Sequence, residues 1–226
     1  KSERTKKAPN PFTTSTLQQE ASKVLNFSTL KTMRLAQQLY EGVEVKGEGV
    51  VGLITYLRTD SIRISEEAQA QAKDYIEANY GEAYLADSVS EKKKTGKIQD
   101  AHEAIRPTNI SRTPTAVKES LSRDQFRLYS LVWKRFTASR MSAAKYETTS
   151  VKIGAGQYRL QVSASRLAFD GFMSVYMSEE DEKGENNALL KSIDETTKLT
   201  LSQVETKQHF TQPPAHYTEA ALVKTL

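Results

Sequence analysis

The spacing of apolar residues changes once along this 226-residue chain, near Tyr146, and the change limits the folds open to it. Before that point, apolar side chains recur every three or four residues, which is the period of an amphipathic helix. After it, β-branched and aromatic residues approximately alternate with polar ones, which is typical of strands. The pattern therefore predicts an α+β protein with a mainly helical part followed by a β-rich part.

Four helices are predicted in the first two thirds of the chain. Capping residues and apolar stripes place them at about 16–26, at Thr29–Glu41, from Ser65 onward and from Ser122 to about Met141. Thr16 and Gln19 have the spacing of a capping box in the first helix. The side chains expected to face inward from the second helix are Leu30, Met33, Leu39 and Tyr40.

The β-rich part is predicted from β-branched and aromatic runs that glycines interrupt. Strands are expected at 146–153, 157–165, 167–176 and near 198–206. The acidic stretch 178–186 predicts a solvated loop between the last two. Earlier in the chain, the apolar run 50–54 predicts one more strand, short and buried.

Composition excludes several classes of function. Cysteine is absent, so the chain has neither disulfides nor thiolate metal sites. No apolar run approaches the roughly 20 residues that span a bilayer, so no membrane partner is expected. The net charge of +4 favours a polyanionic partner such as nucleic acid, because Lys and Arg side chains neutralise phosphates and release their counterions.

Both ends of the sequence suggest a piece of a longer polypeptide. The chain begins at Lys1 in a basic, polar stretch without a signal peptide. It stops at Leu226 within a predicted helix that Thr218 can cap. Because a domain rarely ends within a helix, an excised fragment is expected.

The segment Gly52–Ser61 carries the sharpest chemical signal. If its first residues form a strand, alternation projects Ile54, Tyr56 and Arg58 to the same side. A phenol beside a permanently charged guanidinium suits attack on a phosphodiester, because arginine can bind phosphate oxygens and offset charge in the transition state. Ordinary packing and surface roles are the alternative for both Tyr56 and Arg58.

A second signal lies in Asp100–Pro107. His102 and Arg106 are four residues apart and would share a face of a helix, which Pro107 would end. A zinc helix needs histidine where Arg106 stands, so a zinc site is not expected. The alternative for His102 is a hydrogen-bonded structural role. The acidic run 179–182 lacks a framework to fix metal geometry, so no metal ligand is expected in the chain.

Four segments together resemble bacterial-type DNA topoisomerases of the type IA family. Segment 10–21 resembles the family's entry segment, 52–61 its active-site signature, 101–108 its His-Glu-Ala-Ile-Arg-Pro motif and 213–224 the opening of its next domain. Their order and spacing also match. One departure is His216, which stands where the family usually has arginine.

The resemblance implies a layout for the fragment. Residues 16–142 would form a mainly helical, winged-helix-like domain that carries the tyrosine. Residues 1–15 and 143–212 would form a β-rich arch, and 213–226 would begin the following domain.

The resemblance also implies the reaction and the residues that perform it. Tyr56 would attack single-stranded DNA and keep the 5′ phosphate, which allows strand passage and resealing without ATP. Arg58 would hold the phosphate, His102 would contact DNA, and Asp60 and Arg106 would support them. The enzyme's Mg²⁺ would be bound by acidic residues elsewhere in the same polypeptide. The implied protein is a monomer in the cytoplasm, acting on nucleoid DNA.

Two other functions share some of these sequence features. A non-catalytic nucleic-acid-binding module would need the same basic surface but no reactive tyrosine. A tyrosine recombinase also joins a tyrosine to DNA, but its arginines and histidines precede a late tyrosine. Here Tyr56 precedes the segment with His102 and Arg106, so this function is disfavoured.

Overall fold

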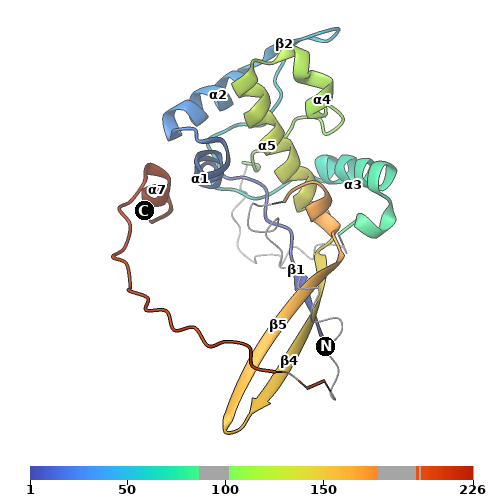
Figure 1. Cartoon of the computed structure of the whole chain (residues 1–226). Coiled ribbons are helices and arrows are strands. Elements are labelled where there is room, and N and C mark those ends of the chain that lie inside the picture. The colour runs from blue at the N-terminus through green and yellow to red at the C-terminus, as the bar shows by residue number, and fades with distance from the viewer. Residues whose placement is uncertain (87–101, 178–196, 199, 226) are drawn as a thin grey trace, which may run out of the picture.

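A helical body and a long β ribbon that extends away from it make up the fold, as Figure 1 shows. The structure is a computed structural model that describes residues 1–86, 102–177, 197–198 and 200–225. The α-helices of the body are α1 (Thr14–Leu25), α2 (Thr29–Glu41), α3 (Glu66–Tyr80), α4 (Pro114–Val117) and α5 (Arg123–Ser139). Short 3₁₀ turns lie at Glu82–Tyr84 (η1) and Lys118–Ser120 (η2). The mixed α and β content predicted from the sequence is confirmed.

Hydroxyl side chains begin the helices of the body. Ser28, Ser65 and Ser122 each accept a hydrogen bond from a backbone N–H in the first turn, so α2, α3 and α5 begin where predicted. The predicted capping box of α1 is wrong. Thr13 is the cap and Thr16 closes the box, because each hydroxyl accepts from the other residue's backbone N–H.

The buried face of α2 differs from the predicted one. Thr32, Leu35, Ala36 and Leu39 are buried, and the helix packs against α1 and α5. Leu30 is 80% exposed and Tyr40 is also exposed, so the inward positions predicted for them are wrong. Leu30 and Tyr40 lie at the edge of the apolar stripe. Packing against α1 and α5 covers the middle of the stripe and leaves this edge at the surface.

A two-stranded hairpin follows α2. It consists of β2 (Val43–Val45) and β3 (Gly49–Val51), paired antiparallel. The short buried strand predicted over 50–54 is confirmed only at Val50 and Val51, where the pairing ends, and Val50 is exposed rather than buried. At Gly52 the chain passes so close to α2 that a Cβ atom would lie 2.7 Å from the carbonyl oxygen of Tyr40. Only glycine fits this approach, and the buried Leu53 and Ile54 follow it.

The β ribbon is a three-stranded antiparallel sheet in the order β1–β4–β5. The long strands β4 (Ala144–Ala155) and β5 (Tyr158–Phe169) form a hairpin, and β1 (Ser2–Lys6) pairs with the base of β4. The first two predicted strands are therefore confirmed. Most of the third is wrong, because the chain turns at Gly171 into the 3₁₀ turn η3 (Gly171–Ser174).

The turn at Gly171 requires glycine for two reasons. Its φ is +49°, in the left-handed region, and a Cβ atom would lie 2.5 Å from the carbonyl oxygen of Ser142. This close approach lets Phe172 and Met173 pack with Ile76 and Met141 in a small core between the ribbon and the body. A larger core lies under α1, α2 and α5.

The last described segment runs back to the helical body. Its residues near 198–206 pair with no strand in the described part of the chain, so the strand predicted there is wrong. The segment ends in α7 (Glu219–Thr225), which lies beside α1 (Figure 1). Thr218 caps α7 as predicted, and Glu219 accepts a hydrogen bond from the Thr29 hydroxyl at 3.0 Å. No helix within the described ranges is long and apolar enough to cross a membrane.

Candidate active site

Three segments that are distant in the sequence meet around Tyr56. The backbone N–H of Thr55 donates to the carbonyl of Arg106 at 2.9 Å, and that of Thr108 donates to Leu53 at 3.0 Å. The N–H of Ile105 in turn donates to Phe12 at 2.8 Å. These bonds place residues 53–55, 105–108 and 12 side by side, so Tyr56 follows a segment that is paired with its neighbour.

The hydroxyl of Thr14 fixes the other end of the Tyr56 segment. It donates to the carbonyl of Leu57 at 2.7 Å and accepts from the N–H of Thr59 at 2.8 Å. The backbone N–H of Thr14 also donates to Thr59 at 2.9 Å. Residues 56–58 are therefore held between two anchored ends, which limits their conformational freedom.

Burial alternates along the segment after Thr55. Leu57, Thr59 and Ser61 are buried, whereas Tyr56, Arg58 and Asp60 are exposed. Tyr56 and Arg58 thus share the exposed side, as predicted. Ile54 does not join them, because it is 1% exposed and bridges to Pro107. The segment forms no regular strand beyond this bridge.

Two aromatic rings flank the phenol of Tyr56. The ring of Tyr40 meets it edge-on, with centroids 5.4 Å apart, and the ring of His102 lies roughly parallel at 6.4 Å. Tyr56 nevertheless stays 43% exposed. The ring is therefore held from two directions at the protein surface, and the structure places His102 beside it.

Arg58 lies at a hollow of about 390 Å³ next to α2. Arg34, on α2, lines the same hollow, as do Leu30 and Met33. Within the described residues Arg58 makes no ion pair or hydrogen bond, including with the Tyr56 hydroxyl. Its guanidinium is therefore available to an anion from outside the chain.

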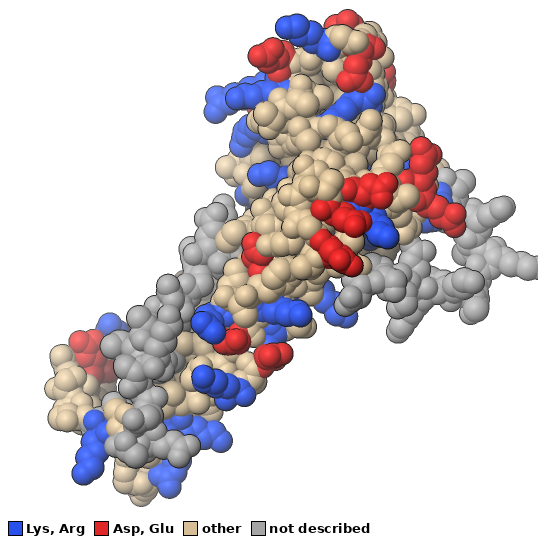
Figure 2. All heavy atoms as spheres, turned by 90° about the vertical axis from the view of Figure 1, so that its right-hand side faces the viewer, with Lys and Arg blue, Asp and Glu red and all other residues tan. Residues whose placement is uncertain are grey.

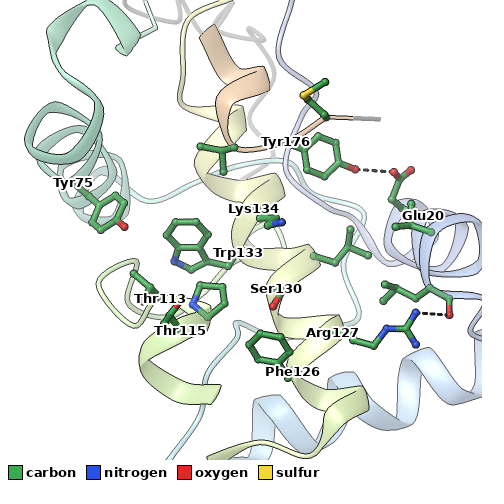
Figure 3. Close-up of a pocket in the computed structure, with 16 residues that line it drawn as sticks. Glu20, Tyr75, Thr113, Thr115, Phe126, Arg127, Ser130, Trp133, Lys134 and Tyr176 are labelled. Carbon is green, nitrogen blue, oxygen red and sulfur yellow. Dashed lines mark hydrogen bonds between the residues drawn. The ribbon is translucent and has the colours of Figure 1, made fainter. Parts of the chain in front are cut away.

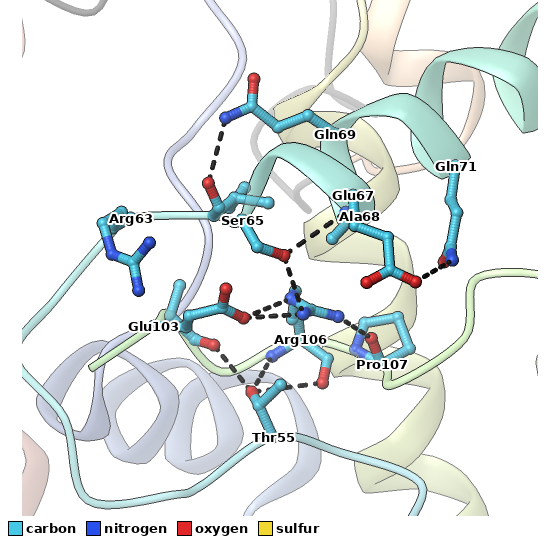
Figure 4. Close-up of polar contacts among 12 residues, drawn as sticks. Thr55, Arg63, Ser65, Glu67, Ala68, Gln69, Gln71, Glu103, Arg106 and Pro107 are labelled. Atoms are coloured by element: carbon cyan, nitrogen blue, oxygen red, sulfur yellow. Dashed lines mark hydrogen bonds and ion pairs between the residues drawn. The ribbon is translucent and has the colours of Figure 1, made fainter. Parts of the chain in front are cut away.

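Arg106, unlike Arg58, is engaged by other residues of the chain. Residues 102–108 are extended rather than helical, so His102 and Arg106 do not share a helix face. The guanidinium of Arg106 is 12% exposed and pairs with the carboxylate of Glu103 at 2.7 Å. It also donates to the carbonyl of Pro107 at 3.0 Å (Figure 4). To reach a phosphate, Arg106 would have to leave these partners.

The pKa of the Glu103 carboxyl is lower than its ordinary value. Burial alone would raise the pKa, but the hydrogen bond and charge of Arg106, with help from Ser65 and Arg63, outweigh burial and hold it below its ordinary value. The Glu103–Arg106 pair therefore joins residues 103–107 to Ser65 at the start of α3, as Figure 4 shows.

A model of the DNA topoisomerase family matches residues 1–226, which is the whole chain. The chain belongs to this family. It is also similar to full-length topoisomerase I from Thermotoga maritima, with 38% identity over 99% of this chain and a TM-score of 0.78. The chain spans 35% of the length of that protein. The resemblance to bacterial topoisomerases drawn from the four sequence segments is confirmed.

Charge is unevenly distributed on the topoisomerase chain. On the face drawn in Figure 2, Lys and Arg side chains lie along the β ribbon with a few Asp and Glu between them, and the helical body carries both signs, including the largest group of Asp and Glu on this face. The described residues include no cluster of three or more His, Asp or Glu side chains that could bind a metal ion. The acidic run 179–182 lies outside the described residues. His216 lies in the exposed segment before α7.

Sequence reasoning missed Tyr40, Thr14 and Thr55 as parts of this site. Tyr40 fell on the apolar stripe of α2 and was assigned to the core. Thr14 lies within segment 10–21, which resembles a family motif. Its hydroxyl bonds the backbone of Leu57, which is 43 residues away in the sequence. No local pattern marks a hydroxyl that bonds so distant a backbone group.

Replacing Glu103 by Gln should lower the free energy of unfolding and make it less dependent on pH in the acidic range. The folded-state pKa of Glu103 is lowered from 4.5, so the pair contributes its full stability above that value and loses it as pH falls through the lowered folded pKa. We expect Glu103→Gln to reduce the free energy of unfolding by about 1–3 kcal/mol at neutral pH. Urea titrations across acidic and neutral pH should show a smaller pH dependence in the variant.

Glu48→Gln is the matched control. Glu48 pairs with Arg112 at 2.8 Å, but its side chain is 44% exposed. An exposed pair contributes only about 0–1 kcal/mol, so this change should have a small effect. If the free energy of unfolding falls equally with acid in wild type and in Glu103→Gln, another group causes the loss of stability.

Proposed function

We propose that this chain carries the nucleophile of a type IA DNA topoisomerase. The Tyr56 oxygen attacks a phosphodiester of single-stranded DNA, forms a bond to phosphorus and displaces the 3′ oxygen, which leaves as a hydroxyl. The 5′ phosphate stays on the tyrosine until the hydroxyl reverses the step. The bond energy is conserved, so relaxation of negative supercoils needs no ATP. The observation that carries this proposal is an exposed Tyr56 on a segment anchored at both ends, with Arg58 on the same side.

Arg58 and His102 have distinct roles in this reaction. A neutral phenol is a weak nucleophile, so attack needs stabilisation of the charge that develops on the phosphate. Arg58 supplies a guanidinium that no described residue engages, and its fork matches two phosphate oxygens. The imidazole of His102 lies beside the Tyr56 ring and contacts the nucleic acid near the scissile bond. Asp60 is exposed nearby and supports the DNA contact.

The Mg²⁺ of the reaction belongs, in this proposal, to another part of the polypeptide. The described residues contain no cluster of three ligating side chains. The residues here therefore do not fit a complete Mg²⁺ site, and no step above depends on the ion.

The strand pairing suggests how the tyrosine is moved. Because β1 pairs with β4, residues 1–15 and 143–212 form one β-rich arch in the proposed division. Residues 16–142 form the winged-helix-like domain that carries Tyr56, and 213–226 begin the next domain. Opening of the arch then separates Tyr56 from the rest of the enzyme for strand passage, within a monomer.

Mapping the covalent adduct tests the proposed nucleophile. The full-length parent enzyme is incubated with single-stranded DNA labelled on the 5′ phosphate side of its cleavage site, and the digested adduct is sequenced. We expect the label on the peptide that contains Tyr56. Tyr158→Phe is a control, because Tyr158 is also exposed but lies at the end of the ribbon. A label on any other tyrosine would refute the assignment.

The isolated 226-residue chain should fail to relax supercoiled plasmid, with or without added Mg²⁺. It spans 35% of the length of the Thermotoga maritima protein, and its described residues lack a metal cluster. Adding the N-terminal region that the family resemblance implies, covalently or in trans, should restore relaxation. Gel assays of plasmid topology measure both results, and relaxation by the isolated chain would contradict this division of roles.

A further inference from the structure

A hollow of about 630 Å³ lies along α5, and Tyr56, Arg58 and His102 are not among its lining residues. As Figure 3 shows, α5 forms its floor, Tyr75 of α3 and the start of α4 line one side, and Glu20 of α1 lines the other. A volume of this size holds a small ligand or one unit of a polymer. The hollow takes no part in the proposed chemistry of Tyr56.

Aromatic rings form one wall of this hollow. Tyr75 meets Trp133 edge-on, with centroids 5.7 Å apart, and Phe126 lies two turns away on α5. The Trp133 indole is fixed, because its Nε1 donates to the carbonyl of Ile110 at 2.8 Å. Because Trp133 is only 6% exposed and its ring is perpendicular to that of Tyr75, Tyr75 offers the face on which a planar ring of a ligand can stack.

Ser130 provides a polar group without a partner. Its Oγ is buried and makes no hydrogen bond, and it is the only such side-chain atom in the described part of the chain. Figure 3 shows Ser130 on α5 between Phe126 and Trp133, within the hollow. A buried hydroxyl without a partner destabilises the fold, so a hydrogen-bonding group from a ligand would offset this cost.

Two cations follow the same face of α5. Arg127 and Lys134 are three and four residues from Ser130, so all three line the hollow on successive turns. Lys134 is exposed and has no ion-pair partner among the described residues, whereas Arg127 donates to the carbonyl of Leu25 at 3.2 Å. These cations favour a ligand with an anionic group at the mouth of the hollow.

Glu20 is the one acidic residue of the lining, and it is already engaged. Its carboxylate accepts a hydrogen bond from the Tyr176 hydroxyl at 2.7 Å. Burial, followed by this bond to Glu20, raises the pKa of Tyr176 to about 12, so the hydroxyl stays protonated and continues to donate at neutral pH. Against this single carboxylate the lining of the hollow carries two cations, Arg127 and Lys134.

We propose that this hollow is a second binding site for single-stranded nucleic acid, taking one nucleotide of the strand. The base stacks on the ring of Tyr75 beside the buried Trp133, its polar edge bonds the Ser130 hydroxyl, and the flanking phosphates face Lys134 and Arg127. The site goes beyond the proposed cleavage function, because it needs neither Tyr56 nor Arg58. It holds the strand at a distance from the reacting phosphate.

Trp133 makes the site directly observable, since it is the only tryptophan of the chain. A short oligothymidylate added to the 226-residue chain should quench its fluorescence and saturate. Ser130→Ala should weaken this binding by roughly 5–30-fold, as the loss of a hydrogen bond to a buried group does. Lys134→Gln should weaken it and lower the salt slope by about 0.7, the value for one phosphate of a single strand.

Three controls separate this site from the Tyr56 surface. Lys73→Gln removes the same charge from the exposed face of α3, outside the hollow, and should leave quenching unchanged. Tyr56→Phe and Arg58→Ala alter the other surface, so saturable quenching of Trp133 should persist in both variants even where contact with the strand at Tyr56 is lost. Thermal melts confirm that each variant is folded, and the exposed Lys134 gives a test that does not disturb the core.

The outcomes decide between the alternatives. Quenching that Arg58→Ala abolishes and that Ser130→Ala and Lys134→Gln leave intact would place the strand at Tyr56 and overturn the proposal. Quenching by thymidine monophosphate but not by oligothymidylate would identify a site for free nucleotides and overturn the assignment to a strand. Absence of quenching by either probe, with a folded chain, would also overturn it.

Discussion

Tyr56→Phe should abolish plasmid relaxation by the full-length topoisomerase and leave its binding to single-stranded DNA nearly intact. The substitution removes only the attacking oxygen, and the ring keeps its contacts with Tyr40 and His102. Loss of a nucleophile in other covalent enzymes lowers kcat by roughly a million-fold, so no relaxation should be detected. Gel assays of plasmid topology and fluorescence anisotropy of a labelled oligonucleotide measure the two properties separately.

The controls for this prediction use the same chain. Tyr158→Phe removes a hydroxyl from an exposed tyrosine of β5 and should relax plasmid at the wild-type rate. Denaturing gels should show covalent protein–DNA adducts in wild type and in Tyr158→Phe only. Adducts that persist in Tyr56→Phe would show that another residue attacks the DNA.

Arg58→Ala should slow DNA cleavage by about a hundred- to a thousand-fold. Removing one preorganised donor from a transition state has an effect of this size. Arg58→Lys should recover part of the rate, because an ammonium group supplies charge without the planar fork. Single-turnover cleavage of a labelled oligonucleotide measures the chemical step apart from strand passage.

Arg159→Ala is the matched control for loss of charge. Arg159 is exposed on β5, and its removal changes the net charge equally. The cleavage rate of this variant at saturating DNA should match wild type. Near-normal cleavage by Arg58→Ala under the same conditions would show that Arg58 does not contribute to the cleavage reaction.

Helix and strand positions were largely predictable because their signals are local. A serine followed by an apolar stripe marked the starts of α3 and α5, an apolar stripe marked α2, and alternation marked β4 and β5. A cap bonds the backbone within three residues, so its geometry is set by nearby sequence. The errors arose where a contact from elsewhere overrode the local pattern, as at Gly52 against Tyr40 and Gly171 against Ser142.

For the candidate site as well, local features follow from the sequence and long-range contacts follow only from the tertiary structure. The sequence alone determined that Tyr56 and Arg58 share a side, because alternation is a property of any extended segment. Only the tertiary structure decided that His102 stacks on Tyr56 and that the Thr14 hydroxyl anchors Leu57. It also decided that Arg106 pairs with Glu103 rather than facing outward beside His102. Such contacts join residues tens of positions apart or depend on the path of an extended segment, and neither leaves a periodic signal in the chain.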